Sequence, residues 1–94
     1  MGLTVKWTRL ALADLENAFE FISKNNDIAA ASVVQLVTAH LTQLEQFPES
    51  GRTGRVKGTR ELVVRATPFV IVYRVNATSL QILAILHSAR KWPP

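Results

Sequence analysis

Apolar residues recur every three or four positions along the first half of the chain, and this spacing predicts two amphipathic helices. Their apolar stripes are Leu12, Leu15, Phe19 and Ile22, followed by Val34, Val37, Leu41 and Leu44. Thr8 and Asp27 are suitable N-caps for the two helices, and Pro48 ends the second one. Asn25 and Asn26 leave a connection so short that the helices must form an antiparallel hairpin.

Strand patterns flank this hairpin. Residues 3–7 alternate apolar and polar side chains, and three β-rich runs follow at 60–66, 69–75 and 80–87. Short turns between the last three runs predict an antiparallel meander, and the nearly all-apolar run 80–87 is typical of a strand inside a sheet. The order βααβββ predicts an α+β fold in which the helical hairpin covers one face of a four-stranded antiparallel sheet. The length fits a single domain over 1–94.

The second face of this sheet, turned away from the hairpin, has no cover in the predicted fold. Its aliphatic positions are Val63, Val70, Val72, Leu83 and Ile85, and the cationic ones on the same alternation are Arg65, Arg74 and His87. An open face that mixes aliphatic and cationic side chains suits an extended or amphipathic partner segment. We therefore expect a macromolecular partner there.

The whole chain has a net charge of +4, and its basic residues concentrate in the second half. Residues 1–50 carry three Lys and Arg against six Asp and Glu, whereas residues 51–94 carry eight against one. A field of one sign attracts polyanions or an acidic partner protein. The alternative is that these charges only keep a hydrophobic sheet soluble.

Several functional classes find no support in the residues. The chain has no cysteine to bind a metal ion. His40 has no second ligand at metal spacing on its helix, so we expect His40 to be a helix-flank residue and not a metal ligand. The tetrad GRTG at 51–54 matches the GXXG of KH domains, but it precedes a strand, so we predict a basic turn at 49–58. No apolar run approaches the roughly 20 residues of a membrane span. We expect no cofactor, no membrane contact and a cytoplasmic location.

Four short motifs follow one another on the predicted elements. They are Ala-x-x-Asp-Leu at 11–15, Gly-Thr-Arg-Glu-Leu at 58–62, Val-Tyr-Arg-Val at 72–75 and Ile-Leu-His-Ser-Ala-Arg at 85–90. Together with the order βααβββ, they resemble the RelE/ParE superfamily of toxins from type II toxin-antitoxin modules over essentially the whole chain. The resemblance implies a small bacterial or plasmid-borne toxin, neutralised by the C-terminal segment of a cognate antitoxin. Operator DNA would be reached only through that antitoxin.

The superfamily resemblance implies one of two activities. RelE-like members cleave mRNA on the ribosome, using basic groups and a general acid or base. Their pattern has an arginine where this chain has Val70, and lysines where it has Glu61 and Val63. The remaining catalytic candidates for a ribonuclease are Arg65, His87 and Arg90.

We therefore favour the ParE branch, whose members bind and poison DNA gyrase without chemistry of their own. The residues expected to bind the target are Arg65, Arg74, His87, Arg90, Lys91 and Trp92. Each also has an ordinary structural alternative: Trp92 could seal the sheet edge, His87 could be a hydrogen-bonded strand end, and the arginines could pair with carboxylates. A third alternative is a toxin-fold protein that acts only as a corepressor with its antitoxin.

Overall fold

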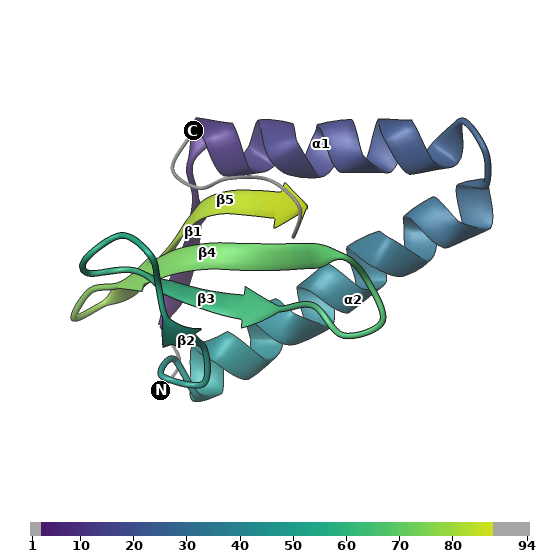
Figure 1. The fold of residues 1–94 in the computed structure, drawn as a ribbon. Coiled ribbons are helices and arrows are strands. Elements are labelled where there is room, and N and C mark those ends of the chain that lie inside the picture. The colour runs from purple at the N-terminus through teal and green to yellow at the C-terminus, as the bar shows by residue number, and fades with distance from the viewer. Residues whose placement is uncertain (1–2, 88–94) are drawn as a thin grey trace.

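The computed structural model describes residues 3–87 and contains two helices and a five-stranded sheet (Figure 1). The elements are β1 Thr4–Trp7, α1 Arg9–Ser23, α2 Asp27–Gln46, β2 Arg52–Thr53, β3 Arg60–Val63, β4 Phe69–Val75 and β5 Ser79–His87. The helices run antiparallel, joined by a tight turn, and pack on one face of the sheet. The predicted α+β fold with a helical hairpin over one face is thereby confirmed.

The sheet differs from the prediction in two respects. Its order is β1-β5-β4-β3-β2, and β1 pairs with β5 in parallel, so the sheet is mixed and not wholly antiparallel. The second difference is β2, a two-residue strand within the segment predicted as a basic turn, which pairs antiparallel with β3. A strand this short leaves no alternation for a sequence pattern to detect.

α1 begins at the predicted cap, since Thr8 Oγ1 accepts a hydrogen bond from Ala11 N at 3.2 Å. Its core-facing stripe is rotated from the predicted one. The residues that pack on the sheet are Ala11, Leu15, Ala18 and Ile22. Leu12 and Phe19, both predicted as buried, are 47% and 41% exposed. The large apolar side chains misled the prediction because alanines occupy half of the true stripe.

α2 is capped by Asn26 and not by the predicted Asp27. Asn26 Oδ1 accepts a hydrogen bond from Ala29 N at 3.0 Å, and Asp27 becomes the first helical residue. A carboxylate in the first turn still stabilises the positive end of the helix dipole. The helix ends at Gln46, ahead of Pro48 as predicted. Of its predicted stripe, Val37, Leu41 and Leu44 are buried and Val34 is half-buried.

Strand β5 contains one residue more than its partner β4 requires. Tyr73 pairs with Ile82, whereas its neighbour Val72 pairs with Ala84, so Leu83 forms a β-bulge. An inserted residue reverses the alternation of side chains along the rest of a strand. The part of β5 after Leu83 therefore turns the opposite set of side chains toward the helices.

This reversal corrects two predictions about the second face. Ile85 is 3% exposed and belongs to the main core under the helices, and His87 packs edge-on against Phe69 with ring centroids 5.9 Å apart. Both were predicted to lie on the second face, which is wrong because a strict period of two cannot include the bulge. Leu83 does pack on the second face, as predicted.

The second face itself is not the open apolar surface that the sequence predicted. Val72, Ala84 and Leu86 form a second, smaller hydrophobic cluster and are at most 5% exposed. Val70 is 2% exposed, while Val63 at 48% is the exposed member of the predicted aliphatic set. This face therefore does not offer a partner an uncovered apolar β-surface.

Thr8 and the first turns of α1 bind the backbone of β5 where its pairing with β1 ends. Thr8 donates to Ile82 O from its backbone N at 3.1 Å and from its Oγ1 at 2.8 Å. Asp14 Oδ2 accepts a hydrogen bond from Ile85 N at 3.1 Å. The pairing of β1 with β5 ends at Trp7 and Ile82, so β5 beyond Ile82 has no neighbouring strand on this side, and a backbone group left unpaired inside the protein is costly. Helix and strand are thus joined where the sheet alone cannot satisfy the backbone.

We predict that Asp14→Ala lowers the free energy of unfolding by about 1–3 kcal/mol, because Ile85 N loses its acceptor. Asp14→Asn keeps an oxygen at this position and should retain most of the stability. Urea unfolding followed by circular dichroism measures both. Glu16→Ala, an exposed change on the same helix, should shift stability by no more than about 0.5 kcal/mol. Equal effects of Asp14→Ala and Glu16→Ala would contradict the role of Asp14.

Candidate functional site

The structure describes three of the six residues predicted to bind the target. These are Arg65, Arg74 and His87, whereas Arg90, Lys91 and Trp92 lie outside residues 3–87. His87 pairs with Phe69 at one end of the β4–β5 pair, and Arg74 pairs with Gln81 toward the other end. Arg65 lies toward the same end as His87, since the preceding Val64 N donates to Phe69 O. The structure therefore separates Arg74 from the other two described residues.

The surroundings of the two arginines also differ. Arg74 is exposed at the end of β4, and its guanidinium donates to Gln81 Oε1 at 2.9 and 3.3 Å. Its described partner is therefore an amide and not the carboxylate considered above. Arg65 follows β3, and its backbone N donates to His40 Nε2 at 3.2 Å.

His40 is a structural residue. It is 8% exposed, and its Nδ1 lies 2.7 Å from Leu36 O while Nε2 accepts from Arg65 N. The neutral tautomer with its proton on Nδ1 satisfies both contacts. His40 thus has a structural role beside the apolar stripe of α2, as expected, and its buried ring ties α2 to the end of β3. Residues 3–87 contain no group of three or more His, Cys, Asp or Glu that could hold a metal ion.

A hollow of about 350 Å³ opens between α1 and the end of the β4–β5 pair. Its lining residues are Asn17, Ala18 and Phe21 from α1 and Phe69, Ile85 and His87 from the sheet. Phe21 is 71% exposed at its rim. This hollow combines an aromatic and aliphatic wall with one imidazole, a composition suited to an apolar side chain of a partner.

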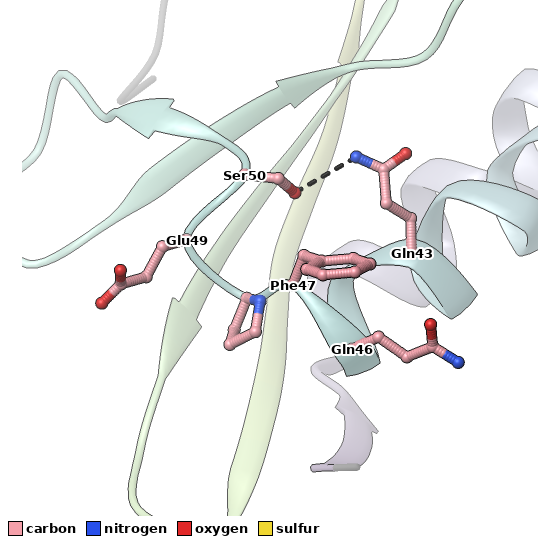
Figure 2. A pocket seen from close by; sticks show the side chains of 6 residues that line it. Gln43, Gln46, Phe47, Glu49 and Ser50 are labelled. Carbon is pink, nitrogen blue, oxygen red and sulfur yellow. Dashed lines mark hydrogen bonds between the residues drawn. The ribbon is translucent and has the colours of Figure 1, made fainter.

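A second and wider hollow, of about 740 Å³, lies at the C-terminal end of α2 (Figure 2). Its lining residues are Gln43, Gln46, Phe47, Pro48, Glu49 and Ser50, and Gln43 Nε2 donates to Ser50 Oγ at 3.2 Å. Phe47 is 63% exposed. Glu49 is the single ionisable residue among the described residues of this lining, so these residues supply no acid and base pair for catalysis.

Glu61 organises the basic loop between α2 and β3. Its carboxylate lies 3.1 Å from Arg52 Nη2 and 3.5 Å from Arg55 Nε, and it accepts a hydrogen bond from Arg55 N at 3.0 Å. The pairing of β2 with β3 sets Arg52 directly opposite Glu61. The glutamate is 2% exposed, so a carboxylate is buried among arginines in the most basic part of the chain.

The pKa of Glu61 reflects two opposing effects. Burial raises the pKa, but the hydrogen bonds from Arg55 N and the Arg52 side chain, together with the two positive charges, outweigh burial and hold the pKa below its ordinary value. The carboxylate is therefore ionised at neutral pH. It neutralises part of the charge of the two arginines and fixes the path of the loop.

Tyr73 holds the other side of the same loop. Its hydroxyl donates to Pro48 O at 2.7 Å and accepts from Gly51 N at 2.9 Å, and the ring is fully buried. A Cβ on residue 51 would lie 2.5 Å from this hydroxyl oxygen, so only glycine fits. Burial raises the pKa of Tyr73 above its ordinary value, which keeps the hydroxyl protonated as the donor to Pro48 O.

The arrangement of helices, sheet and loop agrees with comparisons to known proteins. The sequence matches the family described as ParE toxin of type II toxin-antitoxin system, parDE, over residues 5–92. The chain belongs to the ParE toxin family. The resemblance to the RelE/ParE superfamily is confirmed, and the protein is a toxin of a type II toxin-antitoxin system.

Two relatives and one solved structure are particularly similar to the toxin. The Y4kP protein of Sinorhizobium fredii, whose name describes a toxin, is 38% identical over 95% of this chain and 92% of that protein. Toxin RelE2 of Caulobacter vibrioides is 36% identical over 92% of this chain and 96% of that protein. The chromosomal ParDE toxin-antitoxin system from P. aeruginosa has a TM-score of 0.80 at 31% identity, covering 90% of this chain and 95% of that one. In the toxin, no helix within residues 3–87 is long and apolar enough to cross a membrane.

We predict that Glu61 contributes stability that depends on pH. Because its pKa is lowered in the folded toxin, the ionised group stabilises the fold above the unfolded pKa, and this contribution is lost as the pH falls through the folded value. The free energy of unfolding of the wild type should therefore fall more steeply below pH 4.5 than that of Glu61→Gln. Urea unfolding between about pH 3 and 7 measures this. Glu20→Gln, an exposed control, should keep the wild-type slope, and a wild-type slope in Glu61→Gln would refute the prediction.

Proposed function

We propose that this toxin acts as its ParE relatives are expected to act, by binding and poisoning DNA gyrase, and that a cognate antitoxin neutralises it. Glu61 is the observation that carries the proposal. The RelE-like pattern has a lysine at this position, whereas this chain has the buried carboxylate of Glu61. A negative charge opposes the charge that builds up on a phosphate during RNA cleavage, and loss of one preorganised cationic donor costs about 3–4 kcal/mol of transition-state stabilisation.

The positions of the described ribonuclease candidates also support a binding poison. His87 packs edge-on against Phe69 and lines the hollow beside α1, on the helix side of the sheet. Arg65 follows β3, which is separated from β5 by β4, so the two backbones are about 10 Å apart across the sheet. A general acid and a phosphate clamp must meet at one phosphate, so these two side chains would have to reach toward each other across β4.

The comparisons bear on both candidate targets. The match to the ParE family supports gyrase as the target, while the similarity to toxin RelE2 supports ribosome-dependent mRNA cleavage as the second candidate. Arg90, the third ribonuclease candidate, lies outside the described residues, so an experiment on the target has to separate the two activities.

The antitoxin is proposed to cover the apolar side chains that the helices leave exposed. These are Leu10, Leu12, Phe19 and Phe21 on α1 and Ile28 at the start of α2, between 41% and 81% exposed. α1 uses its alanine-rich stripe for the core, so larger apolar residues remain on both of its flanks. Exposed apolar residues that cluster on one element are typical of protein interaction surfaces.

We predict that the purified toxin traps gyrase on cleaved DNA and inhibits supercoiling, while a purified translation system keeps its mRNA intact. A supercoiling and DNA-cleavage assay with gyrase, run beside primer extension on ribosome-bound mRNA, measures both activities. Addition of the antitoxin should restore supercoiling. Codon-position mRNA cuts with unaffected gyrase would overturn the proposal in favour of the ribonuclease, and growth without arrest or SOS induction would favour the corepressor alternative.

We predict that Phe21→Ser weakens antitoxin binding at least about tenfold, since buried aromatic anchors commonly contribute about 2 kcal/mol or more to an interface. Calorimetric titration of the toxin with the product of the adjacent antitoxin gene measures the change. Phe47→Ser is the matched control, because Phe47 is comparably exposed but lies at the far end of α2 (Figure 2). An equal loss in both variants would remove the α1 surface from the interface.

A further inference from the structure

Three arginines stand on the second face of the sheet near the β2 edge. Arg52 on β2 pairs with Glu61 on β3, which in turn pairs with Val72 on β4. Arg74 lies two positions beyond Val72 on the same strand and therefore on the same face. Arg55 joins this group from the loop, through its contact with Glu61.

Glu61 holds two of these side chains in place without covering them. Arg52 Nη2 and Arg55 Nε both lie within 3.5 Å of the same oxygen, Glu61 Oε1. The glutamate side chain is 1% exposed, whereas the arginine side chains are 58% and 42% exposed. A guanidinium carries five N–H donors, so most of them stay open to solvent. Guanidinium groups that are already oriented lose less entropy when they bind a ligand.

We propose that Arg52, Arg55 and Arg74 form a binding site for the backbone phosphates of double-stranded DNA. Planar guanidinium groups match phosphate oxygens in bidentate geometry. Three cations oppose one carboxylate in this group, within a half-chain that carries eight basic residues and one acidic residue. The positive field of these arginines attracts a polyanion, as expected from the basic second half of the sequence.

Two features favour a duplex over a single strand. Proteins that bind single strands stack the bases on aromatic side chains. The aromatic residues of the described strands, Trp7, Phe69 and Tyr73, all pack in the core under the helices and not on this face. In addition, Arg52 and Arg74 lie two strands and two residues apart, which places their backbones about 12 Å from each other. That separation is comparable with the roughly 12 Å width of the major groove, so the two side chains can reach phosphates on opposite sides of a groove.

Such binding would be independent of sequence, because backbone phosphates carry no base information. It holds whether or not gyrase is the target, and it differs from the expectation that DNA is reached only through the antitoxin. A toxin with this site would be concentrated on DNA, where any DNA-bound target is also found.

Fluorescence anisotropy with the full toxin, free of antitoxin, and a labelled duplex of random sequence tests the site between about 50 and 200 mM salt. Binding of about three phosphates predicts that log K falls against log salt with a slope of roughly −2 to −3. Arg74→Gln should reduce this slope by about 1. The triple variant Arg52→Gln, Arg55→Gln, Glu61→Gln should reduce it by about 2, since the glutamine removes an otherwise unpaired buried carboxylate.

Lys24→Gln is the matched control, because Lys24 lies at the end of α1 and all three variants lower the net charge by one. It should keep the wild-type slope and affinity. If the triple variant fails to fold by circular dichroism, Arg74→Gln still decides the question. No duplex binding by the wild type at 50 mM salt, an equal effect of Lys24→Gln, or tighter binding of single-stranded DNA or RNA than of the duplex would each overturn the proposal.

Discussion

The extra residue at Leu83 is the constraint on which most of the architecture depends. It shifts the register between β4 and β5 close to the segment whose backbone Thr8 and Asp14 bind. It also rotates the last part of β5, which buries Ile85 under the helices and turns His87 toward α1. A position that resembles an RNA-cleaving acid in the sequence becomes part of an apolar hollow because of one inserted residue.

The motifs that identify the family are, in the described part of the chain, mainly structural. Asp14 binds the backbone of β5, and Tyr73 binds both ends of the turn that leads out of α2. Gly58 has a φ of +82°, a conformation that side chains with a Cβ rarely adopt. Glu61 secures the loop that contains β2. These residues stabilise the fold, so their presence identifies the superfamily and does not by itself establish the target.

The sequence predicted the helical hairpin, the order of the elements and the strand meander, because periods of 3.6 and 2 are strong over long segments. Its errors occur where one residue shifts a period or where small residues replace large ones. Leu83 sent Ile85 and His87 to the wrong face, and alanines concealed the true stripe of α1. The parallel pairing of β1 and the position of β2 arise from tertiary contacts that no local pattern encodes. The pairing of Arg52 and Arg55 with Glu61 could have been anticipated, because Glu61 is the one acidic residue of a basic segment.

Glu61 also fixes the structure of the loop that contains β2. A lysine at this position would place a third cation against Arg52 and Arg55 and would remove the acceptor of Arg55 N. Like charges in a buried setting repel, and an unpaired backbone donor there is costly, so the loop would have to rearrange to accept that lysine. The Glu61 carboxylate and the path of the β2 loop are therefore coupled in this chain.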